Sequence, residues 1–254
     1  MISWSTKRRL SILGSILLVI FFAFGMTWYY GIREPVSCQD GLKNGDELGV
    51  DCGGSCGAVC KEELVPLSVV WSKVFPLRDE YYNVAALILN PNQRFSSSKL
   101  AYVFKLYDNN NILITEREGI TFANANERFL IMEPQVSVGK RVPVRAFIEL
   151  FPAEWNRLDS VPVSGMVSTR ELELTQGEQP RLSAKIRNEG LEPVYDISVL
   201  ALILDRNDNA IAVSSTFVNS LTGGAEEQLF FTWPNAFDGV AVAASIYPRL
   251  DRTK

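Results

Sequence analysis

The chain has 254 residues, a formal net charge of −4 and no histidine. The lack of histidine removes the usual general base and the commonest transition-metal ligand together. Outside the basic cluster of residues 7–9, 22 basic residues face 29 acidic ones, a net charge of −7. Because such a surface repels a phosphate backbone, the composition argues against nucleic-acid binding.

The first predicted element is a transmembrane helix. Residues 10–32 form a run of 23 residues without a charge, which as a helix is about 34 Å long and can cross a hydrocarbon core of about 30 Å. Lys7, Arg8 and Arg9 precede this run and predict that residues 1–9 stay in the cytoplasm. We therefore expect a single-pass protein of the cell membrane with an extracytoplasmic carboxy-terminal ectodomain.

A cleaved signal peptide is the alternative interpretation of the same run. Its apolar region would span about 7 to 15 residues and end in small residues. This run is longer, and bulky Met26, Trp28 and Tyr29 occupy its outer end. These features favour an uncleaved anchor.

A cysteine-rich module is predicted at residues 36–61. Cys38, Cys52, Cys56 and Cys60 are separated by 13, three and three residues. In an oxidising compartment this spacing indicates two disulfides, with three possible pairings. A four-cysteine zinc site is less favoured, because such sites prefer close ligand pairs at both ends and a reducing compartment.

Oxygen-bearing side chains lie between the first two cysteines and are interleaved with glycines. They are Asp40, Asn44, Asp46, Glu47 and Asp51. Carboxylate and amide oxygens on tight turns are suitable ligands for Ca²⁺. Asp, Asn and Gly are also good turn formers without any metal, so calcium and plain turn chemistry both remain open.

The module resembles a short motif of secreted and surface proteins, C-x-D-G-x-x-N-G-x-E-x-G-V-D-C-G-G-x-C. The matching residues are Cys38, Asp40, Gly41, Asn44, Gly45, Glu47, Gly49, Val50, Asp51, Cys52, Gly53, Gly54 and Cys56. The resemblance covers about a tenth of the chain. It implies a small extracellular spacer or linker module without an activity.

An internal repeat follows the module. Residues 82–90 align with 180–188, 104–108 with 201–205, and 127–134 with 227–234, and a fourth aligned segment ends each copy. The order is the same in both copies and the offsets are 97 to 100 residues. Short apolar runs separated by Asn, Asp, Gly and Pro indicate β-sandwiches. We therefore predict an all-β ectodomain of two tandem immunoglobulin-like sandwiches, at residues 63–150 and 163–250.

Local patterns support strands and hairpins within each copy. Leu182, Ala184 and Ile186 alternate with polar residues, which predicts a strand with one buried face. The polar runs 108–111 and 205–209 each separate two apolar runs and predict hairpin turns. Residues 151–162 have prolines near both ends and are predicted to be a short linker, with Trp155 at the junction between the sandwiches.

The first copy resembles a known family through FKLYD at residues 104–108. This looks like the FxLYD family of small immunoglobulin-like sandwiches, whereas the second copy reads ALILD at residues 201–205. The resemblance implies extracytoplasmic bacterial or archaeal proteins, and it carries no catalytic residues over to this chain.

Three functions compete. The favoured one is a non-catalytic module that binds a protein or a cell-envelope component, or that serves as a structural spacer. The second is a calcium-dependent adhesion or sensing module centred on the cysteine-rich segment. The third is an envelope hydrolase that uses an acidic pair such as Glu116 and Glu118 or Glu171 and Glu173. Exposed acidic pairs of this kind are usually solvated, so no catalytic residue is assigned.

Overall fold

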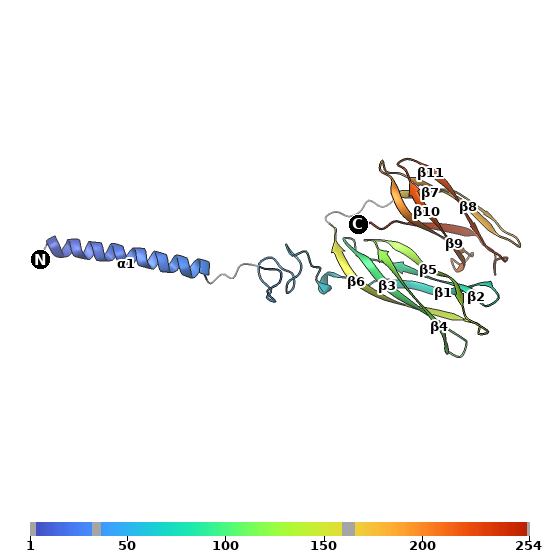
Figure 1. Ribbon diagram of the computed structural model, residues 1–254, viewed down its shortest axis with the longest axis horizontal. Coiled ribbons are helices and arrows are strands. Elements are labelled where there is room, and N and C mark those ends of the chain that lie inside the picture. The colour runs from blue at the N-terminus through green and yellow to red at the C-terminus, as the bar shows by residue number, and fades with distance from the viewer. Residues whose placement is uncertain (1–3, 32–36, 159–165, 253–254) are drawn as a thin grey trace. The chain divides into compact units, whose positions relative to one another are not determined.

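The computed structural model describes residues 4–31, 37–158 and 166–252. The chain divides into two compact units, Met1–Gly57 and Ala58–Lys254. Figure 1 shows one long helix in the first unit and only β-strands and one short helical turn in the second.

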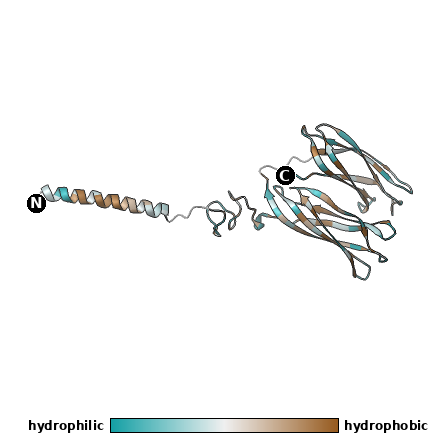
Figure 2. Ribbon diagram, in the orientation of Figure 1, coloured by the Kyte–Doolittle hydropathy of each residue, from teal (hydrophilic) through white to brown (hydrophobic). Residues whose placement is uncertain are grey.

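Helix α1 (Trp4–Gly31) is the long element of the first unit, and none of its residues is buried. In the described part of the chain it is the single helix that is long and apolar enough to cross a membrane. Figure 2 shows a hydrophobic middle and a hydrophilic start, where Lys7, Arg8 and Arg9 lie. A helix with exposed apolar side chains on all sides is typical of a membrane span. The expected apolar helix at the amino terminus is therefore confirmed.

The second unit contains twelve strands in four sheets of three. The first six are β1 (Ser68–Arg78), β2 (Tyr81–Leu89), β3 (Phe95–Tyr107), β4 (Leu113–Ala123), β5 (Arg128–Ser137) and β6 (Arg145–Arg157). The last six are β7 (Val167–Thr175), β8 (Arg181–Asn188), β9 (Val194–Leu204), β10 (Ala210–Leu221), β11 (Glu226–Thr232) and β12 (Ala243–Arg249).

The two copies have the same topology. In the first, the sheets have the orders β1-β2-β5 and β4-β3-β6; in the second, the orders are β7-β8-β11 and β10-β9-β12. Each strand of the first copy thus has its equivalent six strands later, and every pairing is antiparallel. The all-β tandem of sandwiches expected from the sequence repeat is confirmed.

Each sandwich has its own core between its two sheets. Phe104 and Phe129 are fully buried in the first core, and Leu182 and Phe231 are almost fully buried in the second. On β8 the burial alternates along the strand, as the pattern at Leu182, Ala184 and Ile186 predicts. The hairpins β3–β4 and β9–β10 are also present.

The two hairpin turns have the same hydrogen bonds. Asp108 Oδ1 accepts the backbone N–H groups of Asn110 and Ile112, each at 2.9 Å. Asp205 Oδ1 accepts the equivalent bonds from the residues two and four places further on, at 2.8 and 2.9 Å. The last residue of the FKLYD segment is therefore a turn-forming aspartate, and its equivalent at position 205 is an aspartate for the same reason.

A buried asparagine follows the second strand of the first sandwich. Asn90 is fully buried, and its Nδ2 donates to the carbonyl oxygens of Phe95 and Asn124, at 2.9 and 2.8 Å. Its Oδ1 accepts the backbone N–H of Asn92 at 3.1 Å. One side chain thus satisfies polar groups of two connecting loops.

The second sandwich repeats this arrangement 98 residues later. Asn188 is fully buried and donates from Nδ2 to the carbonyl oxygens of Glu192 and Leu221, at 2.8 and 2.9 Å. Its Oδ1 accepts the backbone N–H of Gly190 at 2.9 Å. The sequence repeat therefore corresponds to a repeat of specific side-chain contacts.

The start of the second unit is fastened to the first sandwich. Both carboxylate oxygens of Glu63 accept from Arg157 Nη2 at 2.7 Å. Asn92 bonds to both backbone groups of Val65: its Oδ1 accepts the N–H at 2.8 Å and its Nδ2 donates to the carbonyl at 2.7 Å. These contacts hold the segment before β1 on the body of the sandwich.

A third hydrophobic cluster lies between the two sandwiches. It brings together side chains of the β1-β2-β5 sheet, including Leu87 and Leu130, and of the β10-β9-β12 sheet, including Leu200 and Leu202. The apolar run Val84–Ile88 of β2 is buried on both strand faces, because one face contributes to the first core and the other to this cluster. The sandwiches are therefore joined by a packed interface.

The segment between the sandwiches differs from the sequence prediction. Strand β6 extends to Arg157 and pairs with β3 over its whole length, so residues 151–157 of the predicted linker 151–162 are strand. Pro152 is tolerated there because β6 lies at a sheet edge. Residues 159–162 of the predicted linker lie outside the described residues.

Trp155 is opposite Ser97 in the β3–β6 pairing. It is not a member of the cluster between the sandwiches, as far as the described residues show. The junction is formed instead by side chains of β1, β2, β5, β9 and β10, among them Phe75, Leu87 and Leu202.

Candidate functional site

The cysteine-rich module is held by disulfides. Cys38 and Cys56 are bonded to each other with Cα atoms 5.6 Å apart. Cys52 and Cys60 are also disulfide-bonded, and no described cysteine is free. The disulfide prediction for these residues agrees with the structure, and thiolates for the alternative zinc site are not available.

The carboxylates of the module bind the module's own backbone. Asp51 accepts the N–H groups of Asp40 and Gly41, at distances between 2.9 and 3.2 Å. Asp40 in turn accepts the N–H of Leu42 at 2.9 Å and the Nδ2 of Asn44 at 2.7 Å. These hydrogen bonds lower the pKa of Asp40, with the bond from Leu42 the largest cause.

The other two candidate calcium ligands are similarly occupied. Asp46 Oδ1 accepts from Ser55 Oγ at 2.6 Å, and this bond lowers the pKa of Asp46. Glu47 is buried; its Oε2 accepts the Asn44 N–H at 3.1 Å. Among the described residues, the only acidic or cysteine cluster close enough to hold a metal is Cys38, Glu47 and Cys56, and its two sulfurs form the disulfide. Four of the five candidate side chains, those of Asp40, Asp46, Glu47 and Asp51, thus serve as acceptors within the loop, and the fifth, Asn44, donates to Asp40.

We expect calcium to leave this module unchanged, because its carboxylate oxygens already accept hydrogen bonds from the loop. Amide hydrogen exchange of Asp40 and Gly41 in the full-length protein should be the same with 1 mM Ca²⁺ as with chelator, within about a factor of two. Asp51→Asn, which weakens the acceptor, is the positive control and should speed exchange of both amides. Slowing of about tenfold by calcium would contradict turn chemistry and support the calcium-dependent alternative.

The acidic pairs considered for hydrolysis lie on sheet surfaces. Glu116 and Glu118 are exposed on β4. Glu171 forms an ion pair with Lys185 at 2.5 Å, which raises the pKa of the lysine. Neither pair is brought next to a cavity among those described, so they remain ordinary surface residues.

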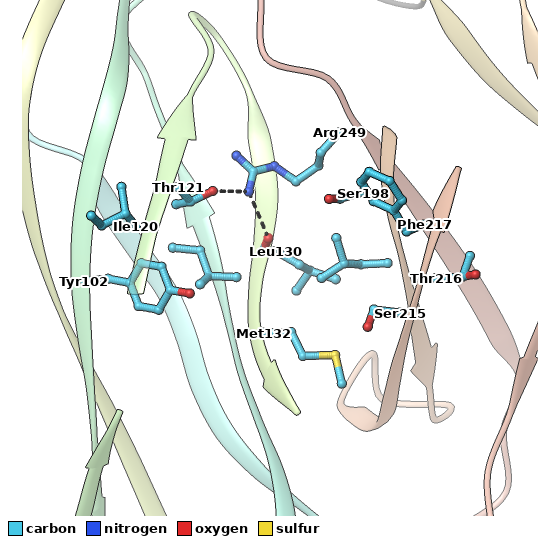
Figure 3. Close-up of a pocket in the computed structure, with 12 residues that line it drawn as sticks. Tyr102, Ile120, Thr121, Leu130, Met132, Ser198, Ser215, Thr216, Phe217 and Arg249 are labelled. Atoms are coloured by element: carbon cyan, nitrogen blue, oxygen red, sulfur yellow. Dashed lines mark hydrogen bonds between the residues drawn. The ribbon is translucent and has the colours of Figure 1, made fainter. Parts of the chain in front are cut away.

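A cavity of about 420 Å³ lies between the two sandwiches and is lined by residues of both. We call it the interdomain cleft (Figure 3). Pockets at domain interfaces with convergent polar groups are the usual places for ligands. The cleft is lined by Tyr102, Ile120, Thr121, Leu130, Ile131, Met132, Ser198, Leu200, Ser215, Thr216, Phe217 and Arg249.

Arg249 enters the first sandwich from the last strand of the second. Its side chain is 5% exposed, and its guanidinium carbon lies 4.3 Å from the ring centre of Phe122 and 4.2 Å from that of Phe129. Each such contact contributes about 0.5 to 2 kcal/mol, the upper value applying where water is excluded. The arginine is thus held between two aromatic rings of the neighbouring domain.

The guanidinium is also hydrogen-bonded to two strands of the first sandwich. Nη1 donates to Thr121 Oγ1 at 3.0 Å and to the Leu130 carbonyl at 3.5 Å, and Nη2 donates to the Phe122 carbonyl at 2.5 Å. Burial lowers the pKa of Arg249, and the carboxylate of Glu127 partly opposes this. Glu127 Oε1 lies 3.9 Å from Nε and forms an ion pair with it, and carbonyl and aromatic groups surround the two Nη atoms.

Tyr102 lies on the side of the cleft that the first sandwich forms, across from Ser215 and Thr216, as Figure 3 shows. Its hydroxyl donates to Glu133 Oε1 at 2.6 Å. Burial, followed by this hydrogen bond, raises the pKa of Tyr102. The phenol therefore stays protonated at neutral pH and acts as a hydrogen-bonding group of the wall.

Sequence reasoning did not identify any residue of the interdomain cleft. Arg249 is one of 25 basic residues, and its neighbours in the sequence show no motif. The sequence contains one signal of the interface between the sandwiches, the apolar run of β2. Because its residues do not alternate with polar ones, both faces of this strand are expected to be buried.

No family model matches the chain, and none of the curated proteins matches it. Among solved structures, the chain is similar to red sea bream transglutaminase at 10% identity, with a TM-score of 0.26, over 74% of this chain and 30% of that one. A β-glucuronidase from glycoside hydrolase family 2 is similar at 9% identity, with a TM-score of 0.21, over 85% of this chain and 29% of that one.

A third similar structure is the tandem CBM22-1-CBM22-2 domain of Paenibacillus barcinonensis Xyn10C. Its identity is 8% and its TM-score 0.15, over 72% of this chain and 85% of that one. This chain spans less than a third of the length of the transglutaminase and of the glucuronidase. Similarities at these scores carry no conclusion about activity or ligand.

Proposed function

We propose that the chain is a single-pass membrane protein whose ectodomain is a non-catalytic binding and spacing module on the extracytoplasmic side. The partner is another protein or a component of the cell envelope. The observation that carries this proposal is the packed interface between the two sandwiches, where Leu87, Leu202 and Arg249 are each almost fully buried. Two domains fixed in this way present one rigid surface, which suits a spacer and a binding platform.

Two further features support the proposed location. The basic residues Lys7, Arg8 and Arg9 lie in the first turns of α1, as the positive-inside rule requires for a cytoplasmic amino terminus. All four cysteines are disulfide-bonded, and disulfides persist in oxidising compartments outside the cytoplasm.

Membership of the FxLYD family is part of the same proposal. Its support is the FKLYD segment on β3 together with the turn built by Asp108 and repeated by Asp205. The repeat explains why an aspartate closes the segment in both copies.

The proposed topology is tested with a chain that carries one epitope tag at each end. Protease added to intact cells should remove the carboxy-terminal tag and leave the amino-terminal tag. The matched variant Lys7→Glu/Arg8→Glu/Arg9→Glu should lose this uniform orientation, because it lacks the cytoplasmic positive charge. A carboxy-terminal tag that survives on intact cells but is digested after lysis would overturn the proposal.

A further inference from the structure

Two strand edges border the interdomain cleft. Leu130–Met132 of β5 and Ser215–Phe217 of β10 each contribute three consecutive residues to its lining. Because side chains alternate between the faces of a strand, three consecutive residues can share one cavity only where the main chain itself borders it. Within the described strands, β5 pairs only with β2, and β10 only with β9. The backbone at the edges of β5 and β10 therefore borders the cleft without a neighbouring strand on that side.

Arg249 shows that this backbone accepts donors from outside its sheet. Its guanidinium donates to the carbonyls of Leu130 on β5 and Phe122 on β4. In an antiparallel pair, the backbone groups of every second residue point to the same side. The N–H and carbonyl of Met132 therefore point to the same free side as the Leu130 carbonyl.

The remaining polar groups of the cleft are uncharged. The hydroxyls of Ser198 and Ser215 line it and have no hydrogen bond to any residue that the structure describes, whereas the side chain of Thr216, next to Ser215 on β10, lies on the other face of the strand. Arg249 is the single charged lining residue, and its Nη groups are already bonded. The cleft therefore offers backbone and hydroxyl groups, with apolar contacts from side chains such as Leu200, and it offers no free charge.

We propose that the interdomain cleft binds an extended, uncharged polypeptide segment, which adds as a further strand to the free edge of β5 at Met132. A strand edge recognises the main chain of its partner through ladder hydrogen bonds, and the adjoining side chains select the residues. A glycan has no such ladder, so the free edge favours a polypeptide. The proposal rests on the binding role proposed above and specifies its ligand.

The test uses the full-length protein in lipid nanodiscs. The probe is a mixture of capped heptapeptides built only from Ser, Thr, Val, Leu and Phe, with empty nanodiscs as the blank. Retained peptides are identified by mass spectrometry, and the affinity of the best one is measured by fluorescence polarisation. We expect at least one peptide to be retained, and the same peptide with N-methylated backbone amides to bind at least tenfold more weakly.

The matched variants change one backbone group. Met132→Pro removes the N–H on the free edge and leaves the β2–β5 ladder intact, because that N–H points away from β2. It should weaken peptide binding at least tenfold, whereas Met132→Leu should leave the affinity within about twofold. An unchanged melting temperature shows that the Met132→Pro variant is folded. The N-methylated peptide tests the same backbone hydrogen bonds from the side of the ligand, without any mutation of the protein.

Three results would overturn the proposal. They are retention of no peptide at millimolar concentration, equal binding of the N-methylated peptide, and binding of an N-acetylglucosamine hexamer in place of peptides. None of them depends on membrane orientation, so the protease experiment can support the proposed function while this ligand assignment fails.

Discussion

Replacing Arg249 with alanine should destabilise the 58–254 unit by about 3 kcal/mol, since a buried polar group left without its partner costs about 1 to 3 kcal/mol and this change leaves two. The carbonyls of Phe122 and Leu130 lose their donor, and the space between the rings of Phe122 and Phe129 becomes empty. At this chain length the melting temperature should fall by roughly 6 to 12 °C. Calorimetry of the full-length protein in detergent measures the change.

Two variants separate charge from packing. Arg249→Met fills the space between the rings without donors, so it should recover part of the loss through its contacts with the two aromatic side chains. Arg141→Ala, at an exposed loop position, is the control and should change stability by less than about 0.5 kcal/mol. If Arg249→Ala behaves like Arg141→Ala, the arginine does not hold the sandwiches together.

Asn90→Ala and Asn188→Ala should each cost about 3 kcal/mol. Each side chain is fully buried and donates to two backbone carbonyls. An unpaired buried polar group costs about 1 to 3 kcal/mol, and each substitution leaves more than one. Urea unfolding followed by tryptophan fluorescence measures the loss in the full-length protein.

Exposed asparagines provide the controls for these two variants. Asn110 and Asn219 are exposed, and their replacement by alanine should change the free energy of unfolding by less than about 0.5 kcal/mol. Similar losses at Asn90 and Asn188 are expected, because the two residues have equivalent roles. A large loss of stability at one of these asparagines and none at the other would contradict their equivalence.

The duplication could be predicted from the sequence because its signals are local. Turn residues such as Asp108 and Asp205, and the alternation at Leu182 and Ile186, depend only on neighbouring residues and on strand geometry. The disulfide state of the four cysteines could be predicted for a similar reason, since it follows from their spacing and the expected compartment.

The interdomain cleft could not be predicted because it depends on contacts between distant parts of the chain. Arg249 is 127 residues from Phe122 in the sequence, and no periodicity relates them. The extension of β6 through Pro152 was missed for another reason. Proline suggests a break, but at a sheet edge its missing N–H costs no ladder bond.

The leucines of the interface have lysines as their counterparts on the outward sheets of the two sandwiches. Leu202 is buried against the first sandwich, while its counterpart 97 residues earlier is Lys105, which pairs with Glu149 on an outward sheet. Likewise Leu87 is buried, and its counterpart 98 residues later is Lys185. The same repeat position is therefore apolar where the two sandwiches meet and carries a lysine on each outward sheet, where burial against a further apolar surface would cost the desolvation of a charge.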